Sequence, residues 1–402
     1  PPYSNSAEST RVSTYTWGAV SDVGTGASGV TEVWVAISSG GAQDIWWNET
    51  TRDFTMNLSS ISLSTQVYKG GTAWQYVAPE YAGMLDDGVN YKVFVYARDL
   101  AGNVQNFSVG MLPGASAAGQ TQPFKYDLTR PTSTVSVPVN GTSVNALTVF
   151  SGVATDPGTS PSGVLKTYMA IRHTSGGTDE IGWLNWSTNL FVNDVSFADP
   201  PANPPDDAWT QVSSTPVQGL ASLAWSTGVP VNMLKSSATY RVVVVSLDQA
   251  TNLQQNPSPV GSGSAFRYDT QAPIVVTTAP IATAYNLAGL LALAGTANDA
   301  TTGNSGLSGV QIILKSKQIG GGGTGAGYWN GGNTNALADW DTVVGTKYGQ
   351  WRAASGLAVW SLAYPNIAFL DSTRFVVWSR ASDLAGNVSN TPSNADLDGA
   401  LN

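Results

Sequence analysis

Nine aspartates occupy corresponding positions in three successive stretches of the sequence, three in each stretch. One member of each set ends a five-residue segment that begins with glycine, one starts a turn that ends in asparagine, and one lies near the end of the stretch. Carboxylate oxygens are ligands that Ca²⁺ prefers, and the ion takes roughly six to eight oxygens in all. The candidate calcium ligands are Asp22, Asp99, Asp127, Asp156, Asp248, Asp269, Asp299, Asp383 and Asp398.

The same residue types also build ordinary turns. Aspartate opens type I turns, glycine supplies a positive φ, and asparagine tolerates the left-handed region. Only three carboxylates are available wherever such a set would meet, which is few for a tight calcium site. Turn chemistry without a metal therefore stays open beside the calcium hypothesis.

The composition excludes several kinds of chemistry. The 402 residues include no Cys and a single His, His173, so any triad or multi-histidine metal site would depend on one residue. With 18 basic and 27 acidic residues, the net charge of −9 argues against nucleic acid as a partner. No apolar run reaches the roughly 18 residues of a membrane span. A Cys-free chain rich in Thr, Ser, Asn and Gly is typical of an extracellular or cell-surface protein.

Three internal repeats reveal the elements that must position the aspartates. A long strand runs into an Asp-x-Ala-x-Asn turn at residues 91–103, 240–252 and 375–387. Upstream of it, the glycine-led segment is followed by Ser-Gly-Val at residues 28–30, 162–164 and 308–310. A third repeat, Tyr-Asp-x-x-x-Pro, occurs at residues 126–131 and 268–273. These repeats predict three domains, at residues 1–127, 128–269 and 270–402.

Each domain is expected to be all-β. The strand signals are short, rich in Val, Ile, Tyr and Trp, and bounded by Gly, Pro, Asn or Asp. One tryptophan per domain, Trp74, Trp225 or Trp360, precedes the long strand and is expected to fill the core. About seven strands in roughly 135 residues, with frequent turns, indicate a β-sandwich.

The glycine-led segment, the Asp-x-Ala-Gly-Asn turn and the Tyr-Asp-x-x-x-Pro linker together resemble tandem bacterial immunoglobulin-like (Big-type) domains of large surface adhesins and extracellular filaments. The middle turn departs from the pattern, with Thr251 where the others have Gly102 and Gly386. The resemblance implies three tandem immunoglobulin-like β-sandwich domains in an elongated rod, with a stalk, spacer or fibre role and no catalysis. Because such adhesins are known for interdomain calcium, it also implies Ca²⁺ at the domain junctions.

In an immunoglobulin-like sandwich, the loop after the second strand, the loop after the sixth strand and the incoming chain lie at one end. Asp156 and Asp248 are therefore expected near Asp127, which lies in the linker that enters the second domain. By the same reasoning, Asp299 and Asp383 are expected near Asp269.

The chain termini indicate a further junction of the same kind. Asp398 lies four residues before the end, so Pro1 of another copy placed after Asn402 nearly restores the Asp-x-x-x-Pro spacing. The expected partner is another copy of the chain, head to tail, with Asp398 beside Asp22 and Asp99 of the next copy. Donation of a terminal strand is a variant of this hypothesis, and a segment of a longer stalk is equally open.

Tryptophans between the predicted strands suggest the main alternative function, a secreted carbohydrate-binding module in which their rings stack on sugars. Because such tryptophans occur in all three domains, we favour a structural role in which they pack along the edge of each sandwich. Glycans stay among the expected partners. Seven tryptophans lie in segments expected to be loops: Trp46, Trp47, Trp183, Trp186, Trp329, Trp340 and Trp351.

Catalytic groups are not indicated. The acidic pairs Asp86-Asp87, Asp179-Glu180 and Asp206-Asp207 lie in polar segments, where solvated acids are ordinary. His173 follows a strand expected to end at Ile171 and is expected on the surface. The sequence therefore predicts a non-enzymatic structural protein, a repeating subunit or segment of a surface filament or adhesin stalk. An S-layer or phage-fibre component is a structural alternative.

Overall fold

The computed structural model describes these residues: 15–40, 45–48, 50–56, 72–77, 85–105, 121–192, 207–213, 220–255, 263–282, 284–285, 290, 292–299, 303–316, 327–332, 337–341, 349–363, 373–389 and 391–393. In these ranges the chain forms strands and one short 3₁₀ helix, η3 (Leu337–Asp339). Within the same ranges, no helix approaches the length and apolar character needed to cross a bilayer. The expected all-β architecture is confirmed, and the strands group into three successive sandwiches, called sandwiches 1, 2 and 3 below.

Sandwich 1 contains β1 (Tyr15–Ala19), β2 (Val30–Gly40), β3 (Ile45–Asn48), β4 (Asp53–Met56), β5 (Ala73–Val77), β6 (Asn90–Asp99) and β7 (Thr121–Lys125). One sheet pairs β1 with β5, and the other has the order β4-β3-β2-β6-β7. Alternate residues of β2, such as Val33 and Val35, point inward and pack with Trp74 of β5 and Val93 of β6. The core therefore lies between the two sheets.

Sandwich 2 contains β8 (Thr132–Val137), β9 (Thr142–Val144), β10 (Val149–Thr155), β11 (Val164–Gly176), β12 (Gly182–Asn185), β13 (Leu190–Val192), β14 (Thr210–Gln211), β15 (Ser222–Gly228), β16 (Ala238–Asp248) and β17 (Ser264–Tyr268). The smaller sheet has the order β15-β10-β8. The larger has the order β13-β12-β11-β16-β17-β9, with β14 on β11. The core joins Phe150 and Trp225 of the smaller sheet to Ile171, Tyr240 and Phe266 of the larger one.

Sandwich 3 contains β18 (Ile274–Ala279), β19 (Ala292–Asn298), β20 (Leu307–Ser316), β21 (Gly327–Trp329), β22 (Trp340–Asp341), β23 (Arg352–Ala353), β24 (Val359–Ala363) and β25 (Phe375–Asp383). One sheet has the order β18-β19-β24, and the other the order β22-β21-β20-β23, with β25 also on β20. Leu293 and Trp360 of the first sheet pack against Ile312 and Leu314 of the second.

The glycine-led repeat is explained by a tryptophan on the neighbouring strand. Gly18 pairs with Trp74, Gly152 with Trp225, and Gly295 with Trp360. A Cβ atom on Gly152 would lie 2.6 Å from the Trp225 ring and 1.9 Å from a carbonyl oxygen of β8, so no side chain fits there. The three tryptophans are buried, which confirms the expectation that they fill the cores.

A tyrosine corner supports the immunoglobulin-like assignment of the first two sandwiches. The Tyr91 hydroxyl accepts a hydrogen bond from the Asp86 N–H at 2.8 Å, and the Tyr240 hydroxyl accepts one from the Lys235 N–H at the same distance. Both tyrosines lie near the start of the long strand, β6 or β16. Phe375 has the corresponding place in β25 and carries no hydroxyl.

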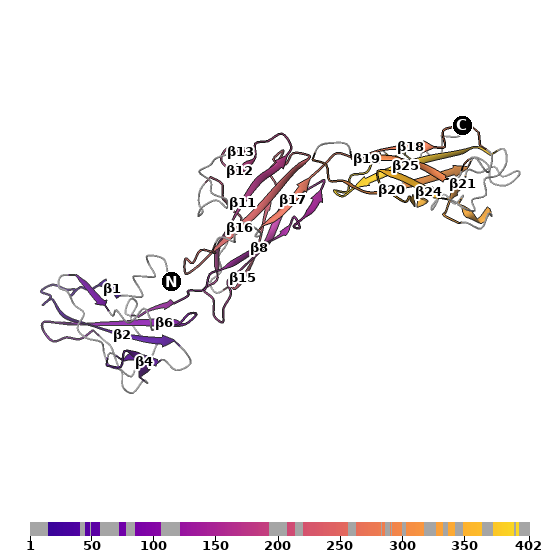
Figure 1. The fold of residues 1–402 in the computed structure, drawn as a ribbon. Coiled ribbons are helices and arrows are strands. Elements are labelled where there is room, and N and C mark those ends of the chain that lie inside the picture. The colour runs from indigo at the N-terminus through magenta and orange to yellow at the C-terminus, as the bar shows by residue number, and fades with distance from the viewer. Residues whose placement is uncertain are drawn as a thin grey trace.

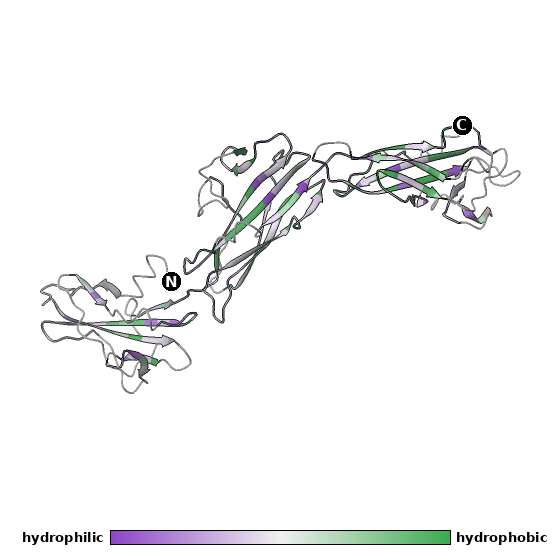
Figure 2. Ribbon diagram, in the orientation of Figure 1, coloured by the Kyte–Doolittle hydropathy of each residue, from purple (hydrophilic) through white to green (hydrophobic). Residues whose placement is uncertain are grey.

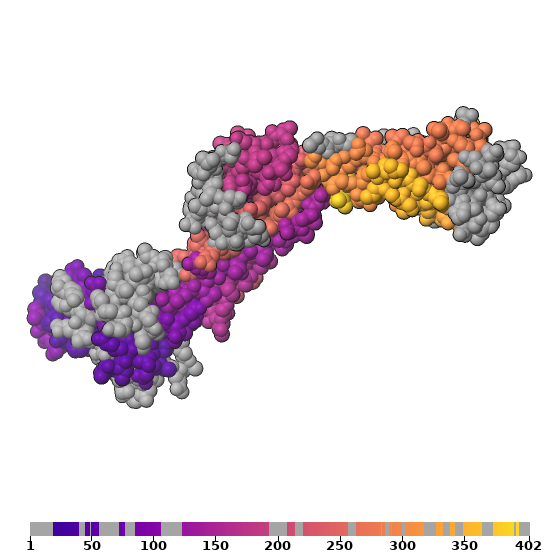
Figure 3. All heavy atoms as spheres, in the orientation of Figure 1, coloured from indigo at the N-terminus to yellow at the C-terminus, as the bar shows by residue number. Residues whose placement is uncertain are grey.

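The sandwiches follow one another along an elongated molecule (Figure 1), and the space-filling view shows the same rod (Figure 3). Hydropathy alternates along many strands, as expected for sheets with one buried face (Figure 2). No strand pairing among the described residues joins a strand before residue 127 to a strand after it, or crosses residue 269. The two connections are therefore single linkers, each with an aspartate.

Candidate metal centre

The fold brings six of the nine aspartates together in two groups of three. Asp156 directly follows β10, Asp248 ends β16, and Asp127 lies in the linker between β7 and β8. Three ligand oxygens, one from each residue, lie within 4.8 Å of one another. This set is called triple 1.

Triple 2 repeats the arrangement at the start of sandwich 3. Asp299 directly follows β19, Asp383 ends β25, and Asp269 directly follows β17. Its three ligand oxygens also lie within 4.8 Å of one another. The expected grouping of aspartates around Asp127 and Asp269 is therefore present in the structure.

All six carboxylates are buried. The exposed fraction of the residue is 0 or 1% for each member of triple 1, and it rises to 6% only at Asp299 in triple 2. None of the six forms an ion pair with a side chain in the described ranges. Three acids buried together without an ion-pair partner repel one another and lose hydration, so the arrangement is costly while all three are charged.

Backbone amides position the loop and linker carboxylates of triple 1. Asp156 Oδ2 accepts a hydrogen bond from the Gly163 N–H at 2.7 Å. Asp127 Oδ2 accepts one from the Ser162 N–H at 2.6 Å, and Asp127 Oδ1 accepts one from the Thr129 N–H at 3.1 Å. Consecutive amides of one loop therefore orient carboxylates from two different segments.

The third carboxylate of triple 1 is held by its own turn. Asp248 accepts hydrogen bonds from the Asn252 N–H and from Asn252 Nδ2, both at 2.8 Å. Asn252 Nδ2 also lies 2.9 Å from the backbone oxygen of Asp127, to which it donates. The asparagine of the Asp-x-Ala-x-Asn turn thus connects the long strand of sandwich 2 to the incoming linker.

Triple 2 uses the same contacts. Asp299 Oδ2 accepts from the Gly306 N–H and Asp269 Oδ2 from the Ser305 N–H, both at 2.7 Å. Asn387 donates to both oxygens of Asp383 at 2.8 Å and to the backbone oxygen of Asp269 at 2.7 Å. The two triples are therefore two copies of one hydrogen-bonded unit.

One oxygen in each triple has no hydrogen-bond partner. Asp156 Oδ1 and Asp299 Oδ1 are buried, and no described residue donates to them. Burial, together with the charge of Asp127, raises the pKa of Asp156 to about 6. Burial raises the pKa of Asp248 to about 7, with the neighbouring carboxylates adding to the shift. Burial likewise raises the pKa of Asp299.

These features fit a hard divalent cation. The candidate ligands are all oxygen, with no imidazole or thiolate, which favours Ca²⁺ or Mg²⁺ over transition metals. Asp156, Asp248 and Asp127 would hold the ion in triple 1, and Asp299, Asp383 and Asp269 in triple 2. The ion would supply the positive charge that no ion pair provides to these carboxylates, and a partner for the unpaired oxygens.

The remaining three sequence candidates do not form a third group in the described structure. Asp22 Oδ2 accepts from the Gly29 N–H at 2.8 Å, and Asp99 accepts from the Asn103 N–H and Nδ2 at 2.7 Å. Both are partly exposed, and no third described carboxylate joins them. Asp398 lies outside the described residues.

The prediction that residues 308–310 form the third copy of the loop repeat was wrong. In sandwich 3, the residues that correspond to Ser162 and Gly163 are Ser305 and Gly306, because their amides donate to Asp269 and Asp299. The spacing of seven residues from aspartate to glycine, the same in all three sandwiches, is the signal that identifies them. Ser308 instead lines a pocket on sandwich 3.

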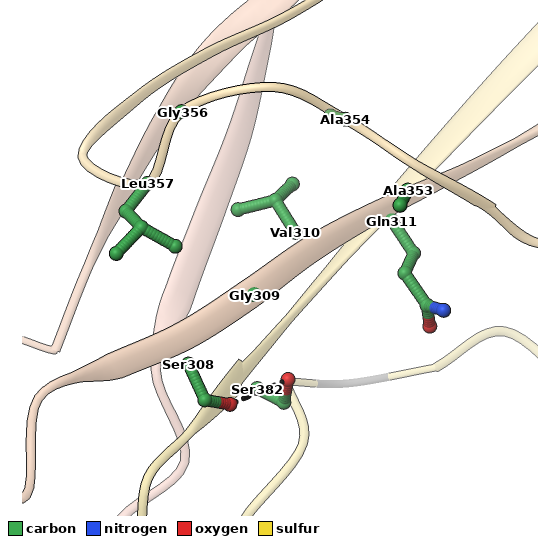
Figure 4. Close-up of a pocket in the computed structure, with 9 residues that line it drawn as sticks. All are labelled: Ser308, Gly309, Val310, Gln311, Ala353, Ala354, Gly356, Leu357 and Ser382. Atoms are coloured by element: carbon green, nitrogen blue, oxygen red, sulfur yellow. Dashed lines mark hydrogen bonds between the residues drawn. The ribbon is translucent and has the colours of Figure 1, made fainter.

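That pocket, of about 430 Å³, lies on sandwich 3 beside β20 and β23 (Figure 4). Its lining side chains are all neutral, and the Ser308 hydroxyl donates to the Ser382 hydroxyl at 3.0 Å. No ionisable side chain is among the residues that line it. It is lined by Ser308, Gly309, Val310, Gln311, Ala353, Ala354, Gly356, Leu357 and Ser382.

His173 is buried and not on the surface as expected. β11 continues to Gly176, beyond Ile171, and His173 lies on the same inward face as Ile171. Its ring nitrogens lie 3.0 Å from the Glu180 oxygen and 3.1 Å from the Ser175 oxygen, and its ring packs on Phe191 and Tyr240. His173 is therefore a core residue.

The tryptophans expected in loops mostly lie in strands. Trp46, Trp47, Trp183, Trp329 and Trp340 belong to β3, β12, β21 and β22 and are buried. Trp186 and Trp351 flank strands and are half-buried. An exposed stacking platform for sugars is not formed by these rings.

For two of the three acidic pairs, Asp86-Asp87 and Asp179-Glu180, the structure describes both residues. The Asp87 carboxylate accepts from the Leu128 N–H at 2.7 Å and from the Thr129 hydroxyl, so it fastens the first linker. Glu180 offers its backbone oxygen to His173. In the third pair, Asp206 lies outside the described residues.

Comparison with known proteins shows likeness only among solved structures. No protein-family model and no curated protein matches the chain. The chain is similar to a tetra-tandem repeat from the extending region of a large adhesion protein, with 16% identity over 96% of this chain and 70% of that one, at a TM-score of 0.24. It is also similar to a 1.5-MDa bacterial ice-binding adhesin, with 14% identity over 94% and 88% of the chains, at a TM-score of 0.26.

A third similar structure comprises the FN1–FN3 domains of chicken CNTN1, with 10% identity over 93% and 90% of the chains, at a TM-score of 0.26. The structural neighbours are thus tandem immunoglobulin- and fibronectin-like repeats, two of them from large bacterial adhesins. Likeness of this size carries no argument about function.

Proposed function

We propose that the chain is a structural spacer of an extracellular stalk or filament at the cell surface, with domains at residues 1–127, 128–269 and 270–402. The observation that carries this proposal is the pair of buried carboxylate triples, one at each linker. Each would bind one Ca²⁺ ion and so fasten the linker to the sandwich that follows it. The chain then acts as a stiff rod and not as a catalyst.

The role of the ion follows from the segments that supply its ligands. Asp127 belongs to the linker, whereas Asp156 directly follows β10 and Asp248 ends β16 of sandwich 2. An ion held by all three opposes movement of the linker relative to the sandwich. In its absence, repulsion among the three charges favours their separation. Calcium therefore controls both the stability and the stiffness of the joint.

Thermal unfolding with calcium or with EGTA tests the proposal. A ligand that binds only the folded state at 100 times its Kd adds about 2.7 kcal/mol, which corresponds to an increase in unfolding temperature on the order of 10 °C. We expect an increase of this size at neutral pH, together with a narrower distribution of molecular lengths in small-angle X-ray scattering. An unchanged unfolding temperature would leave only turn chemistry at the joints.

Variants that replace an aspartate by asparagine sharpen the test, because their effect on stability should differ between EGTA and calcium. Asp156→Asn and Asp299→Asn each remove one charge from a triple, so each variant should be as stable as the wild type or more stable in EGTA. In calcium, each should lose much of the increase. Asp22→Asn is the matched control, because Asp22 has the same bond to a loop glycine but no complete triple. Equal effects of all three variants would contradict the proposal.

A further inference from the structure

The carboxylates of each triple come only from a linker and from the sandwich that follows it. In triple 1, Asp127 lies in the linker, Asp156 directly follows β10 and Asp248 ends β16 of sandwich 2. Triple 2 has the same division between the residue after β17 and sandwich 3. An ion in a triple therefore fastens the linker to the following sandwich and places no restraint on the preceding one. Neighbouring domains move relative to each other unless an interface holds them.

A basic residue two positions before each linker aspartate reaches the loop whose amides bind that aspartate. This loop is called the joint loop (residues 160–163 in sandwich 2 and residues 303–306 in sandwich 3). Lys125 Nζ donates to the Ser160 backbone oxygen at 3.1 Å, to the Ser160 hydroxyl at 2.9 Å and to the Pro161 oxygen at 2.9 Å. The Arg267 guanidinium donates to the Asn304 oxygen. Both basic residues are half-buried, which strengthens these charge-assisted hydrogen bonds.

The turn before the long strand of the preceding sandwich packs on the same joint loop. At the first joint, a Cβ atom on Gly88 would lie 3.3 Å from the Ser160 backbone oxygen, and at the second, a Cβ atom on Gly303 would overlap the Ser237 backbone oxygen. Gly88 and Ser237 each lie three residues before the corner tyrosine. Ser160 and Gly303 each lie two residues before the serine whose amide binds the linker aspartate. The same two positions therefore meet at both joints, and one of the two is a glycine each time.

This turn of the preceding sandwich also holds the linker. The Asp87 carboxylate accepts a hydrogen bond from the Leu128 N–H at 2.7 Å, and the Ser236 hydroxyl accepts one from the Thr270 N–H at 2.9 Å. Both donors directly follow a linker aspartate, and both acceptors lie directly before the turn residue that packs on the joint loop. The preceding sandwich is thus bound to the linker and to the joint loop through groups other than the carboxylates of the triple.

We propose that these contacts form an interface that fixes the angle between successive sandwiches, with Lys125 and Arg267 as its positioning residues. The surface is the end of one sandwich, and the partner that it fits is the joint loop of the next. The inference rests on the proposed function in one respect, since an ion that holds the linker makes a stiff rod only if the preceding sandwich is held as well. The interface itself contains no ligand of the ion.

Distances between spin labels across the first joint test the role of the basic residue. Because the chain has no cysteine, Asn90→Cys and Ser136→Cys place labels at exposed positions on the two sides of the joint. Lys125→Met should broaden the distance distribution about twofold, since the bonds to the joint loop are lost. Lys125→Arg should keep the wild-type width, because arginine makes this contact at the second joint. Lys166→Met is the matched control and should change nothing, as no described residue bonds to that ammonium group.

A pair of glycines tests the packing at the second joint, with labels at the exposed positions Val231→Cys and Thr278→Cys. Gly303 has φ 85° and Gly26 has φ 83°, so alanine strains the backbone alike at both. A Cβ atom on Gly26 would meet nothing within 4 Å, whereas one on Gly303 would meet the preceding sandwich. Gly303→Ala should therefore broaden the distance distribution at this joint, and Gly26→Ala should leave it unchanged. Equal widths in the two variants would contradict the packing contact.

Thermal unfolding of the same variants in calcium and in EGTA separates the interface from the ion. Lys125→Met should keep a cooperative transition and the increase in unfolding temperature with calcium, which shows that it is folded and that its triples bind. A distance distribution as narrow as that of the wild type would overturn the inference, as would a loss of the calcium effect as large as in Asp156→Asn. If the wild type shows no calcium effect, the ion sites fail, and the widths of Lys125→Met and the wild type in EGTA still decide the interface.

Discussion

Sandwiches 2 and 3 share their carboxylate triples and the hydrogen bonds that hold them, but they differ in other contacts near the joints. At the first joint, Lys125 Nζ donates to Ser160 and to the Pro161 oxygen, at distances of 2.9 to 3.1 Å. At the second, the Arg267 guanidinium donates to the Asn304 oxygen. The basic residue of the strand before the linker thus reaches the next sandwich in both cases, through different atoms.

The turns and corners differ as well. Thr251 has φ 68° where Gly386 has φ 91°. Tyr240 forms a corner hydrogen bond that Phe375 cannot form. The aspartates and their direct hydrogen bonds are the same in the two joints, whereas the turn residue, the tyrosine corner and the contact of the basic residue vary. These differences show that turns and corners can be built in more than one way around one arrangement of carboxylates.

The largest expected effect is a dependence of stability on pH in EGTA. Burial raises the pKa of Asp156 to about 6 and of Asp248 to about 7, above the ordinary value of 3.8. The folded state therefore holds protons that the unfolded state releases. This stabilisation is fully present below about pH 4 and is lost as the pH rises through about 6 to 7. We expect a loss on the order of a few kcal/mol between pH 4 and 8.

Urea unfolding of the wild type, Asp248→Asn and Asp299→Asn at several pH values measures this effect. Asp248→Asn should flatten the pH dependence more than Asp299→Asn, because the pKa of Asp248 is raised to about 7. Saturating calcium should reverse the trend, since the ion favours the charged forms. Stability that rises with pH in EGTA would show that the triples are not strained by their charges.

The tyrosine corner gives a smaller effect. Tyr240→Phe leaves the Lys235 N–H without its acceptor, and Tyr91→Phe does the same for the Asp86 N–H. We expect each variant to lose about 1 to 2 kcal/mol of unfolding free energy in urea. Tyr268→Phe is the control, because no described residue bonds to that hydroxyl, and it should change little. If the control loses as much as Tyr240→Phe, the corner is not the cause.

The smallest expected effect on stability comes from the turn position that is Thr251 in sandwich 2 and Gly386 in sandwich 3. A β-branched residue in the left-handed region costs about 1 kcal/mol relative to glycine. Thr251→Gly should therefore stabilise sandwich 2 by roughly 0.5 to 1 kcal/mol, and Gly386→Thr should destabilise sandwich 3 by about 1 kcal/mol. Differential scanning calorimetry of the two variants checks both signs. A loss of stability in Thr251→Gly would mean that the threonine side chain contributes more than the strain costs.

Much of the fold could be predicted from the sequence because the same motifs occur in each of the three domains. The buried tryptophans and the six grouped aspartates were predicted correctly, since the same spacing recurs wherever the same contact forms. His173 was misplaced because β11 runs five residues past Ile171, and nothing in the local sequence marks that extension. The third loop repeat was predicted at Ser308 because residues 308–310 read Ser-Gly-Val, whereas the amide contacts come from Ser305 and Gly306, and Gly306 lies seven residues after Asp299.

Other parts of the candidate site could not be predicted. The contact of Lys125 with Ser160 joins residues of two sandwiches, and no pattern within either one indicates it. The unpaired oxygens of Asp156 and Asp299 depend on which loop amides point at each carboxylate, which only the assembled loop defines. Short strands such as β21 and β22 carry too few residues for an alternating pattern to appear.

The bonds to the linker aspartate have a mechanical consequence. Asp127 is held through its side chain by Ser162 and through its backbone by Asn252. Tension along the molecule therefore passes from the linker into two loops of sandwich 2 before it reaches the paired strands. The load is shared by several short contacts acting in parallel, and the joint limits how far the rod extends under pulling. Contour length then grows with the number of sandwiches and not with slack in the linkers.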